Sequence, residues 1–195
     1  MNPFPTGITR VYLAGLHGSE TEHWQSRWLR QDPSALWLEQ ENWDHPDLDR
    51  WTSDLGRAAA SSRGPLFLVA HSLGCHLAAA WAGRAGAGRV LGALLVAPPD
   101  PSRPELRALV RGLDRLPQSK LPFPSLLVAS RDDPYAGLGQ AKQLAAQWGS
   151  RLLDAGKLGH INLASNLGDW EQGLDWLASF QAGLLPAARP LPARR

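Results

Sequence analysis

Apolar runs, each the length of a β-strand, recur along this chain and are separated by helix-like segments. Residues 65–70 (PLFLVA), 90–96 (VLGALLV) and 125–129 (SLLVA) contain almost no polar side chain. A strand with one exposed face alternates apolar and polar residues, whereas a strand covered by helices on both faces reads as a continuous apolar run. The chain is therefore predicted to fold as an α/β protein in which helices cover both faces of a mostly parallel sheet.

Further strand and helix candidates complete a three-layer sandwich. Shorter runs rich in strand-forming residues at 8–14, 35–39 and 151–154 bring the expected sheet to five or six strands. In the first helical segment, Ser19 and Glu22 have the spacing of a capping box, which places a helix start at Ser19. Helices are expected at residues 19–28, 45–62, 73–85, 104–113, 139–148 and 169–184.

The length of 195 residues corresponds to about one domain. We expect a single domain over residues 1–184 and find no internal repeat. Residues 185–195 combine three prolines with three arginines and no acidic residue. This composition is typical of a solvated, disordered tail.

Composition and charge exclude several functional classes. The net charge of +2 provides no strong field for nucleic acid, and no apolar run approaches the ~18 residues of a membrane-spanning helix. Cys75 is the only cysteine, so an internal disulfide is excluded. The histidines show no metal-ligand spacing, and we expect neither a metal nor another cofactor. The N-terminal residues lack the basic and apolar segments of a secretory signal, which favours a cytoplasmic location.

One serine lies between an apolar strand and an alanine-rich helix in residues 66–80 (LFLVAHSLGCHLAAA). Around Ser72 the chain reads small-x-Ser-x-Gly, with Ala70 and Gly74 as the small residues. This pattern is typical of a nucleophile elbow, where a sharp turn from strand to helix exposes the serine and leaves room only for small neighbours. The alternative interpretation is a serine that only caps the helix.

Candidate partners for a nucleophilic serine follow two later strands. Asp132 and Asp133 come directly after the run at 125–129, and His160 lies in a glycine-containing loop after the last expected strand. The carboxyl ends of parallel strands meet at one edge of a sheet, so these side chains can converge on the serine. Spacing alone does not choose between Asp132 and Asp133. An aspartate turn and a loop histidine are also common without any chemical role.

A tetrahedral intermediate on this serine needs N–H donors for its oxyanion. The amide of Leu73, directly after the serine, is the first candidate. The second is expected in the loop after the first strand, where Leu16 is the preferred donor and His17 the alternative. Two glycines in that loop, Gly15 and Gly18, let the backbone approach the reaction centre closely.

Four segments together resemble a known protein family. They are Ala14-Gly15 followed by His23-Trp24-Gln25, the segment from Val69 to Gly74, Ser130-Arg131-Asp132-Asp133-Pro134-Tyr135, and Gly159-His160-Ile161-Asn162 with Ser165, Gly168 and Trp170. From residue 8 to about 182, the chain resembles the small α/β-hydrolase-fold serine hydrolases related to retinoblastoma-binding protein nine and the bacterial YdeN-like proteins. The resemblance implies a compact fold without a large cap domain. It also implies that Asp133, which directly precedes the proline, is the catalytic acid.

The chain departs from the family pattern near its C-terminal end. Asn166 stands where the family pattern has Gly, and both residue types tolerate a positive φ. Asp169 and Glu171 stand where the family often has Pro. These departures leave the three candidate catalytic residues in place.

The combined features predict a serine hydrolase acting on small ester or amide substrates. Ser72 would form the acyl-enzyme, His160 would act as the base, and Asp133 would orient it. The small-molecule substrate is the expected partner, bound in a shallow site. Candidate contacts at the rim, each with packing as its alternative interpretation, are His23, Trp24 and Tyr135.

Tryptophan is the unusual feature of the composition and supports a second hypothesis. The chain has nine tryptophans against two tyrosines, and five of the nine fall between residues 24 and 51. Packing in the core is one interpretation. The other is that the Trp-rich N-terminal third forms the contact surface of a non-catalytic scaffold. A homodimer formed through exposed aromatic side chains also stays open.

Overall fold

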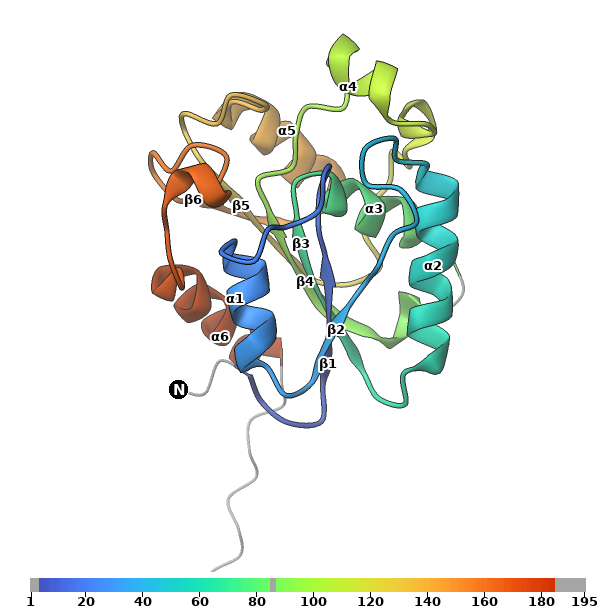
Figure 1. The fold of residues 1–195 in the computed structure, drawn as a ribbon, viewed down its shortest axis with the longest axis vertical. Coiled ribbons are helices and arrows are strands. Elements are labelled where there is room, and N and C mark those ends of the chain that lie inside the picture. The colour runs from blue at the N-terminus through green and yellow to red at the C-terminus, as the bar shows by residue number, and fades with distance from the viewer. Residues whose placement is uncertain (1–3, 85–86, 185–195) are drawn as a thin grey trace, which may run out of the picture.

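Six parallel strands form the centre of the computed structural model, which describes residues 4–84 and 87–184 (Figure 1). Across the sheet the strands run in the order β2-β1-β3-β4-β5-β6, and each neighbouring pair is parallel. They are β1 (Thr9–Leu13), β2 (Ala35–Trp37), β3 (Leu66–His71), β4 (Val90–Val96), β5 (Ser125–Ala129) and β6 (Arg151–Asp154). The predicted architecture is confirmed, with the larger of the two expected strand numbers.

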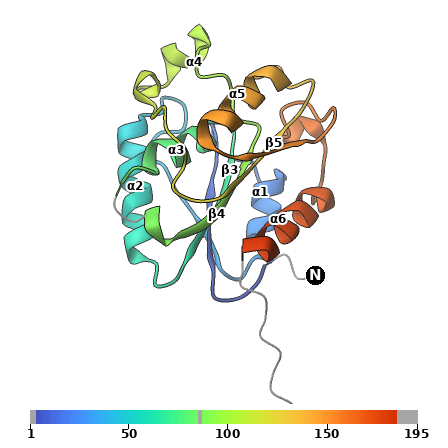
Figure 2. The same ribbon diagram turned by 180° about the vertical axis from the view of Figure 1, so that it is seen from behind.

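Helices cover both faces of this sheet (Figure 1, Figure 2). Helices α1 and α6 pack on one face, and α2, α3 and α5 pack on the other. The short α4 lies beyond the carboxyl ends of the strands (Figure 1). The helices are α1 (Trp24–Gln31), α2 (Leu48–Ser61), α3 (Leu73–Trp81), α4 (Pro104–Leu109), α5 (Leu138–Trp148) and α6 (Glu171–Leu184).

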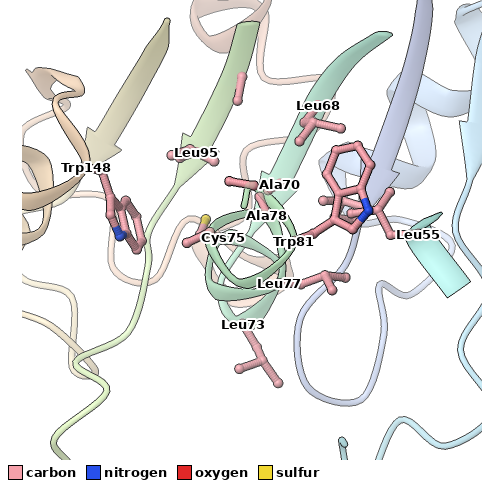
Figure 3. Close-up of a cluster of buried hydrophobic side chains, with 14 of the residues drawn as sticks. Leu55, Leu68, Ala70, Leu73, Cys75, Leu77, Ala78, Trp81, Leu95 and Trp148 are labelled. Atoms are coloured by element: carbon pink, nitrogen blue, oxygen red, sulfur yellow. The ribbon is translucent and has the colours of Figure 1, made fainter. Parts of the chain in front are cut away.

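The central strands are apolar throughout because their residues alternate between two cores. In β3, all of whose residues are buried, Leu68 and Ala70 belong to the core against α2, α3 and α5. Phe67 and Val69 belong to the core under α1 and α6. Figure 3 shows Leu68 and Ala70 beside helix α3. The continuous apolar run is thus the direct consequence of helices on both faces.

Helix α1 begins later than the capping-box spacing predicts. Its first residue is Trp24, and its N-cap is His23, whose Nδ1 accepts a hydrogen bond from the amide of Gln25 at 3.1 Å. The hydroxyl of Ser19 donates to the side chain of Gln25 instead of accepting from a backbone amide. The expected helix start at Ser19 is therefore wrong.

For the other helices, the main differences from the predicted residue ranges lie at the C-terminal ends. Helix α3 ends at Trp81 and α4 at Leu109, each short of its expected limit. Between β4 and β5 the chain forms only α4 and a 3₁₀ turn (Leu113–Arg115), so no segment of cap-domain size is inserted between these two strands. The tail expected at 185–195 lies outside the described residues. In residues 4–84 and 87–184, every helix is too short or too polar to span a lipid bilayer.

Candidate active site

Ser72 occupies the turn between the end of β3 at His71 and the first residue of α3, Leu73. Its backbone has φ 53° and ψ −124°, a conformation that residues other than glycine rarely adopt. Its side chain makes no hydrogen bond to the first turn of α3, so the helix-cap interpretation does not hold. A strained serine at a turn from strand to helix is typical of a nucleophile elbow.

A continuous set of hydrogen bonds joins Ser72 to His160 and His160 to Asp133. The Oγ of Ser72 lies 2.9 Å from Nε2 of His160. The Nδ1 of His160 lies 3.0 and 2.9 Å from the two carboxylate oxygens of Asp133. Because a carboxylate only accepts, the neutral imidazole that fits this bond has its proton on Nδ1 and a free lone pair on Nε2. In this tautomer Nε2 can accept the hydroxyl proton of Ser72, as a general base must.

The three side chains meet because each follows the carboxyl end of a strand. Ser72 follows β3, Asp133 lies in the loop after β5, and His160 lies in the loop after β6. Asp133 and His160 are each only 8% exposed. Hydrogen bonds between charged and polar groups are stronger in such a poorly solvated position than in water. The structure thus brings together the three residues that the sequence predicts as a catalytic set.

Asp132 has a different position from Asp133. Its Oδ1 accepts hydrogen bonds from the hydroxyl of Ser130 at 2.8 Å and from the amide of Gly159 at 2.9 Å. These two bonds lower the pKa of the Asp132 carboxyl below its usual value. Asp132 therefore holds the loop that precedes His160, whereas Asp133 contacts the imidazole. Of the two aspartates that spacing leaves open, the geometry favours Asp133 as the partner of His160.

The backbone amides of Leu16 and Leu73 have no acceptor within the described part of the chain. Leu73 is the first residue of α3, where backbone amides have no partner inside the helix. The amide of His17 donates to the carbonyl of Trp43 at 3.0 Å and is not free to bind an oxyanion. Of the two donors that the sequence leaves open in this loop, the geometry favours Leu16.

A cavity of about 240 Å³ opens at Ser72. It is small beside the ~300–1,000 Å³ of pockets that enclose drug-sized ligands. One part of its wall is apolar and another is polar. The apolar part consists of Leu16, Leu73, Pro99, Leu106 and the ring of Tyr135, and the polar part includes Glu20, His23 and Asn162.

The three expected rim residues have different positions. Tyr135 lines the cavity and is 48% exposed, and its ring centroid lies 4.5 Å from that of His160. His23 also lines the cavity but is only 2% exposed, so it forms part of the wall. Trp24 is equally buried and does not line the cavity. The structure gives Trp24 a packing position in place of the rim position that the sequence suggests.

Two further imidazoles lie beside His160. The ring centroid of His71 is 5.0 Å from that of His160, and the centroid of His23 is 4.8 Å from that of His71. Burial lowers the pKa of His23 to about 4 and the pKa of His71 well below its usual value. Both side chains are neutral at neutral pH, so they do not repel the positive charge of a protonated His160.

The hydrogen bonds that hold the His160 loop from outside are not foreseen by the sequence. The indole of Trp24 donates to the carbonyl of Ile161 at 2.8 Å. The Nε2 of His71 donates to the carbonyl of His160 at 3.0 Å. Bonds from a side chain to a distant backbone carbonyl leave no spacing or residue pattern, so no signal in the sequence could have revealed them.

Comparisons with known proteins identify the family of this chain. The chain matches the family model described as serine hydrolase over residues 11–179. It is similar to a protein from Pectobacterium atrosepticum named as a YdeN-like hydrolase, with 38% identity, a TM-score of 0.81, and coverage of 92% of this chain and 93% of that chain.

Two more distant likenesses, both below 25% identity, show the fold alone. The ydeN gene product from B. subtilis has 24% identity and a TM-score of 0.71, with 91% of this chain and 100% of that chain covered. Est1E from Butyrivibrio proteoclasticus has 12% identity and a TM-score of 0.69, with 94% of this chain and 91% of that chain covered. A search of the curated proteins finds no match.

Proposed function

The chain belongs to the serine hydrolase family, and from this premise we propose that it cleaves small esters through an acyl-enzyme on Ser72. Small amides are the second substrate class of the proposal. His160 acts as the general base, and Asp133 orients its imidazole. One observation carries the proposal above all others. Hydrogen bonds run without a break from the Oγ of Ser72 through the imidazole of His160 to the carboxylate of Asp133.

The first half of the reaction acylates the enzyme. Nε2 of His160 takes the hydroxyl proton while Oγ of Ser72 attacks the carbonyl carbon of the ester. The amides of Leu16 and Leu73 donate hydrogen bonds to the oxyanion that forms. The ester C–O bond then breaks, and His160 gives its proton to the leaving alcohol. Asp133 stabilises the imidazolium while the charge exists.

The second half releases the acid. A water molecule gives a proton to Nε2 of His160 and attacks the acyl carbon, and the same two amides bind the second oxyanion. The bond from the acyl carbon to Oγ breaks, and Ser72 recovers its proton from His160. No other reactant is needed, because water supplies both the hydroxyl of the acid and the proton of the alcohol.

The size of the cavity supports a small acyl group. Its volume is about 240 Å³, and α4 contributes Leu106 to its apolar lining. Apolar contacts with Leu106 and Pro99 favour an acyl chain over a polar or charged group. A long fatty acyl chain exceeds this volume and has to extend into water, where it gains no burial.

The alternative hypothesis of a non-catalytic scaffold requires exposed tryptophans in the N-terminal third. Trp24, Trp28 and Trp51 are buried in the two cores. Trp37 and Trp43 are only half-buried, but they are a minority of the five. The Trp-rich segment is mainly core packing, which favours the enzyme over the scaffold.

A fluorophosphonate probe tests the proposal directly, because it labels only a serine that is activated as a nucleophile. We expect the wild-type protein to be labelled and Ser72→Ala to be silent. His160→Ala should also lose labelling although it keeps the hydroxyl of Ser72. A folded wild-type protein that resists the probe and cleaves no chromogenic ester would contradict the proposed function.

A further inference from the structure

The loop that carries His160 is bonded through its backbone to side chains at five consecutive residues, 158–162. The side chains that make these bonds are Ser130 and Asp132 from the loop after β5, His71 from the end of β3, Trp24 from α1, and Ser165 from the turn that directly follows the loop. We propose that Trp24 and His71 are positioning residues that set the orientation of the His160 imidazole for catalysis. This inference rests on the proposed function, in which His160 is the general base.

Trp24 holds the residue directly after His160. Its indole N–H donates to the carbonyl of Ile161 at 2.8 Å, across 137 residues of sequence. Ile161 has φ +49°, which is strained for a β-branched residue. A strained conformation persists only where surrounding contacts enforce it. Trp24 is 2% exposed and Ile161 is fully buried, so water cannot replace the indole as a donor.

His71 holds the peptide group of His160 itself. Its Nε2 lies 3.0 Å from the carbonyl oxygen of His160. A carbonyl oxygen only accepts, so Nε2 of His71 carries a proton and donates it in this bond. Burial keeps the ring of His71 neutral, so the bond forms without placing a positive charge beside His160. His71 therefore supplies a fixed donor immediately before the nucleophile in the sequence.

Together the two donors fix two consecutive carbonyls of the loop. On the other side of His160, the carboxylate of Asp132 accepts from the amide of Gly159 at 2.9 Å. The backbone at His160 is thus held from both directions, and its side chain has to satisfy Ser72 and Asp133 simultaneously. Loss of one donor allows the peptide to rotate, and the imidazole then moves relative to both partners. Catalytic groups need positions fixed to within about 0.5 Å.

Trp28 provides a matched control on the same helix. Its indole N–H donates to the carbonyl of Asp169 at 2.7 Å, and its side chain is fully buried. Like Trp24, it packs against Trp170. Trp24→Phe and Trp28→Phe therefore remove the same kind of bond from α1 to the same C-terminal region. They differ in whether the bonded carbonyl adjoins His160.

The test compares kcat, KM and thermal stability of both variants on one short-chain ester. We expect similar decreases in Tm. Trp24→Phe should lower kcat by about 10- to 100-fold with KM nearly unchanged, since a shift of about 1 Å can slow a reaction 100-fold. Trp28→Phe should keep kcat within about twofold of wild type. Equal kcat losses in the two variants would overturn the role of Trp24.

A second pair of variants tests His71. His71→Leu removes the donor, whereas His71→Gln keeps an N–H that can reach the same carbonyl. We expect a loss of kcat in His71→Leu that His71→Gln largely restores. Equal losses would assign His71 to packing alone. The two outcomes are separable from a failure of the proposed function, because in that case the wild-type protein itself has no esterase activity.

Proton NMR gives a readout that needs no turnover. The Nδ1 proton of His160, in its bond to Asp133, should give a far-downfield resonance in wild type and Trp28→Phe. The same resonance should broaden or vanish in Trp24→Phe and His71→Leu. An unchanged resonance in both of these variants would contradict a positioning role.

Discussion

A β-carbon placed on Gly15 would lie 2.7 Å from the β-carbon of Ser72 and 3.1 Å from its Oγ. The loop after β1 therefore runs directly against the candidate nucleophile, and only glycine permits this approach. The same approach presents the next residue, Leu16, with its amide free of any acceptor in the described residues. The position of this candidate oxyanion donor thus depends on the absence of a side chain at residue 15.

Gly15→Ala should lower activity by displacing this loop. The added methyl group has to move away from Ser72, and the amide of Leu16 moves with it. Loss of one oxyanion donor typically lowers kcat by about 10²- to 10³-fold. Steady-state kinetics on a short ester, combined with a thermal melt, measures the effect. Gly139→Ala in α5, where a β-carbon meets nothing within 4 Å, is the control and should keep wild-type kcat. A folded Gly15→Ala with full kcat would show that the loop does not supply the donor.

Asp133→Asn and Asp132→Asn should differ in their effect on kcat. An amide at position 133 no longer holds the Nδ1 proton of His160 in the required tautomer, and kcat should fall by on the order of 10³- to 10⁴-fold. The amide oxygen of asparagine at position 132 can still accept from Ser130 and Gly159. Asp132→Asn should therefore lose about tenfold or less, by analogy with other neutral hydrogen-bond replacements.

The kinetics of the two aspartate variants are measured on the same ester and with the phosphonate probe. Circular dichroism spectra of both variants serve as the control for folding. A larger loss of kcat in Asp132→Asn than in Asp133→Asn would contradict the proposal that Asp133 is the catalytic acid.

The protein should hydrolyse esters with short acyl chains more efficiently than esters with long ones. The cavity of about 240 Å³ accommodates an acetyl or butyryl group against Leu106 and Pro99, whereas a decanoyl chain projects into solvent. We expect kcat/KM to fall from butyryl to decanoyl esters. Leu106→Ala should move the optimum towards longer chains, because it removes side-chain volume from the apolar wall contributed by α4 and so enlarges the cavity. An optimum at decanoyl in the wild-type protein would refute the size argument.

The sheet and the principal residues of the candidate site are predictable from the sequence because each leaves a local signal. Burial of both faces makes β3, β4 and β5 continuously apolar. The turn from strand to helix requires small residues around Ser72. The site then forms where the carboxyl ends of the strands meet, which places His160 and the Asp132–Asp133 pair near the serine without knowledge of any distance. The choice of Asp133 within that pair comes from the family resemblance.

The remaining features depend on long-range contacts that leave no local signal. The start of α1 depends on which groups bond to Gln25, and the spacing of Ser19 and Glu22 cannot reveal that. The preference for Leu16 over His17 depends on the carbonyl of Trp43, which occupies the amide of His17. The bond from Trp24 to Ile161 spans 137 residues. Such pairings are set by the packed fold rather than by any segment.

The stability of the fold should decrease as the pH falls below 6.5, and His76 should contribute to this decrease. Its ring is fully buried and contacts the carbonyl of Pro99 at 2.8 Å, and burial lowers its pKa from 6.5 to about 4. Between these two values the unfolded chain binds a proton at residue 76 and the native protein does not. The free energy of unfolding therefore decreases as the pH is lowered, by about 1.4 kcal/mol per pH unit for one such group.

His76→Gln should reduce the slope of the free energy of unfolding against pH by the equivalent of about one bound proton. Glutamine does not titrate, but it can still donate a hydrogen bond to the carbonyl of Pro99. Urea unfolding at several pH values between 6.5 and about 4 measures the slope for each protein. His23 and His71 shift in the same direction, so the variant should retain part of the pH dependence. Equal slopes for wild type and His76→Gln would mean that the ring of His76 becomes protonated in the native protein as readily as in the unfolded chain.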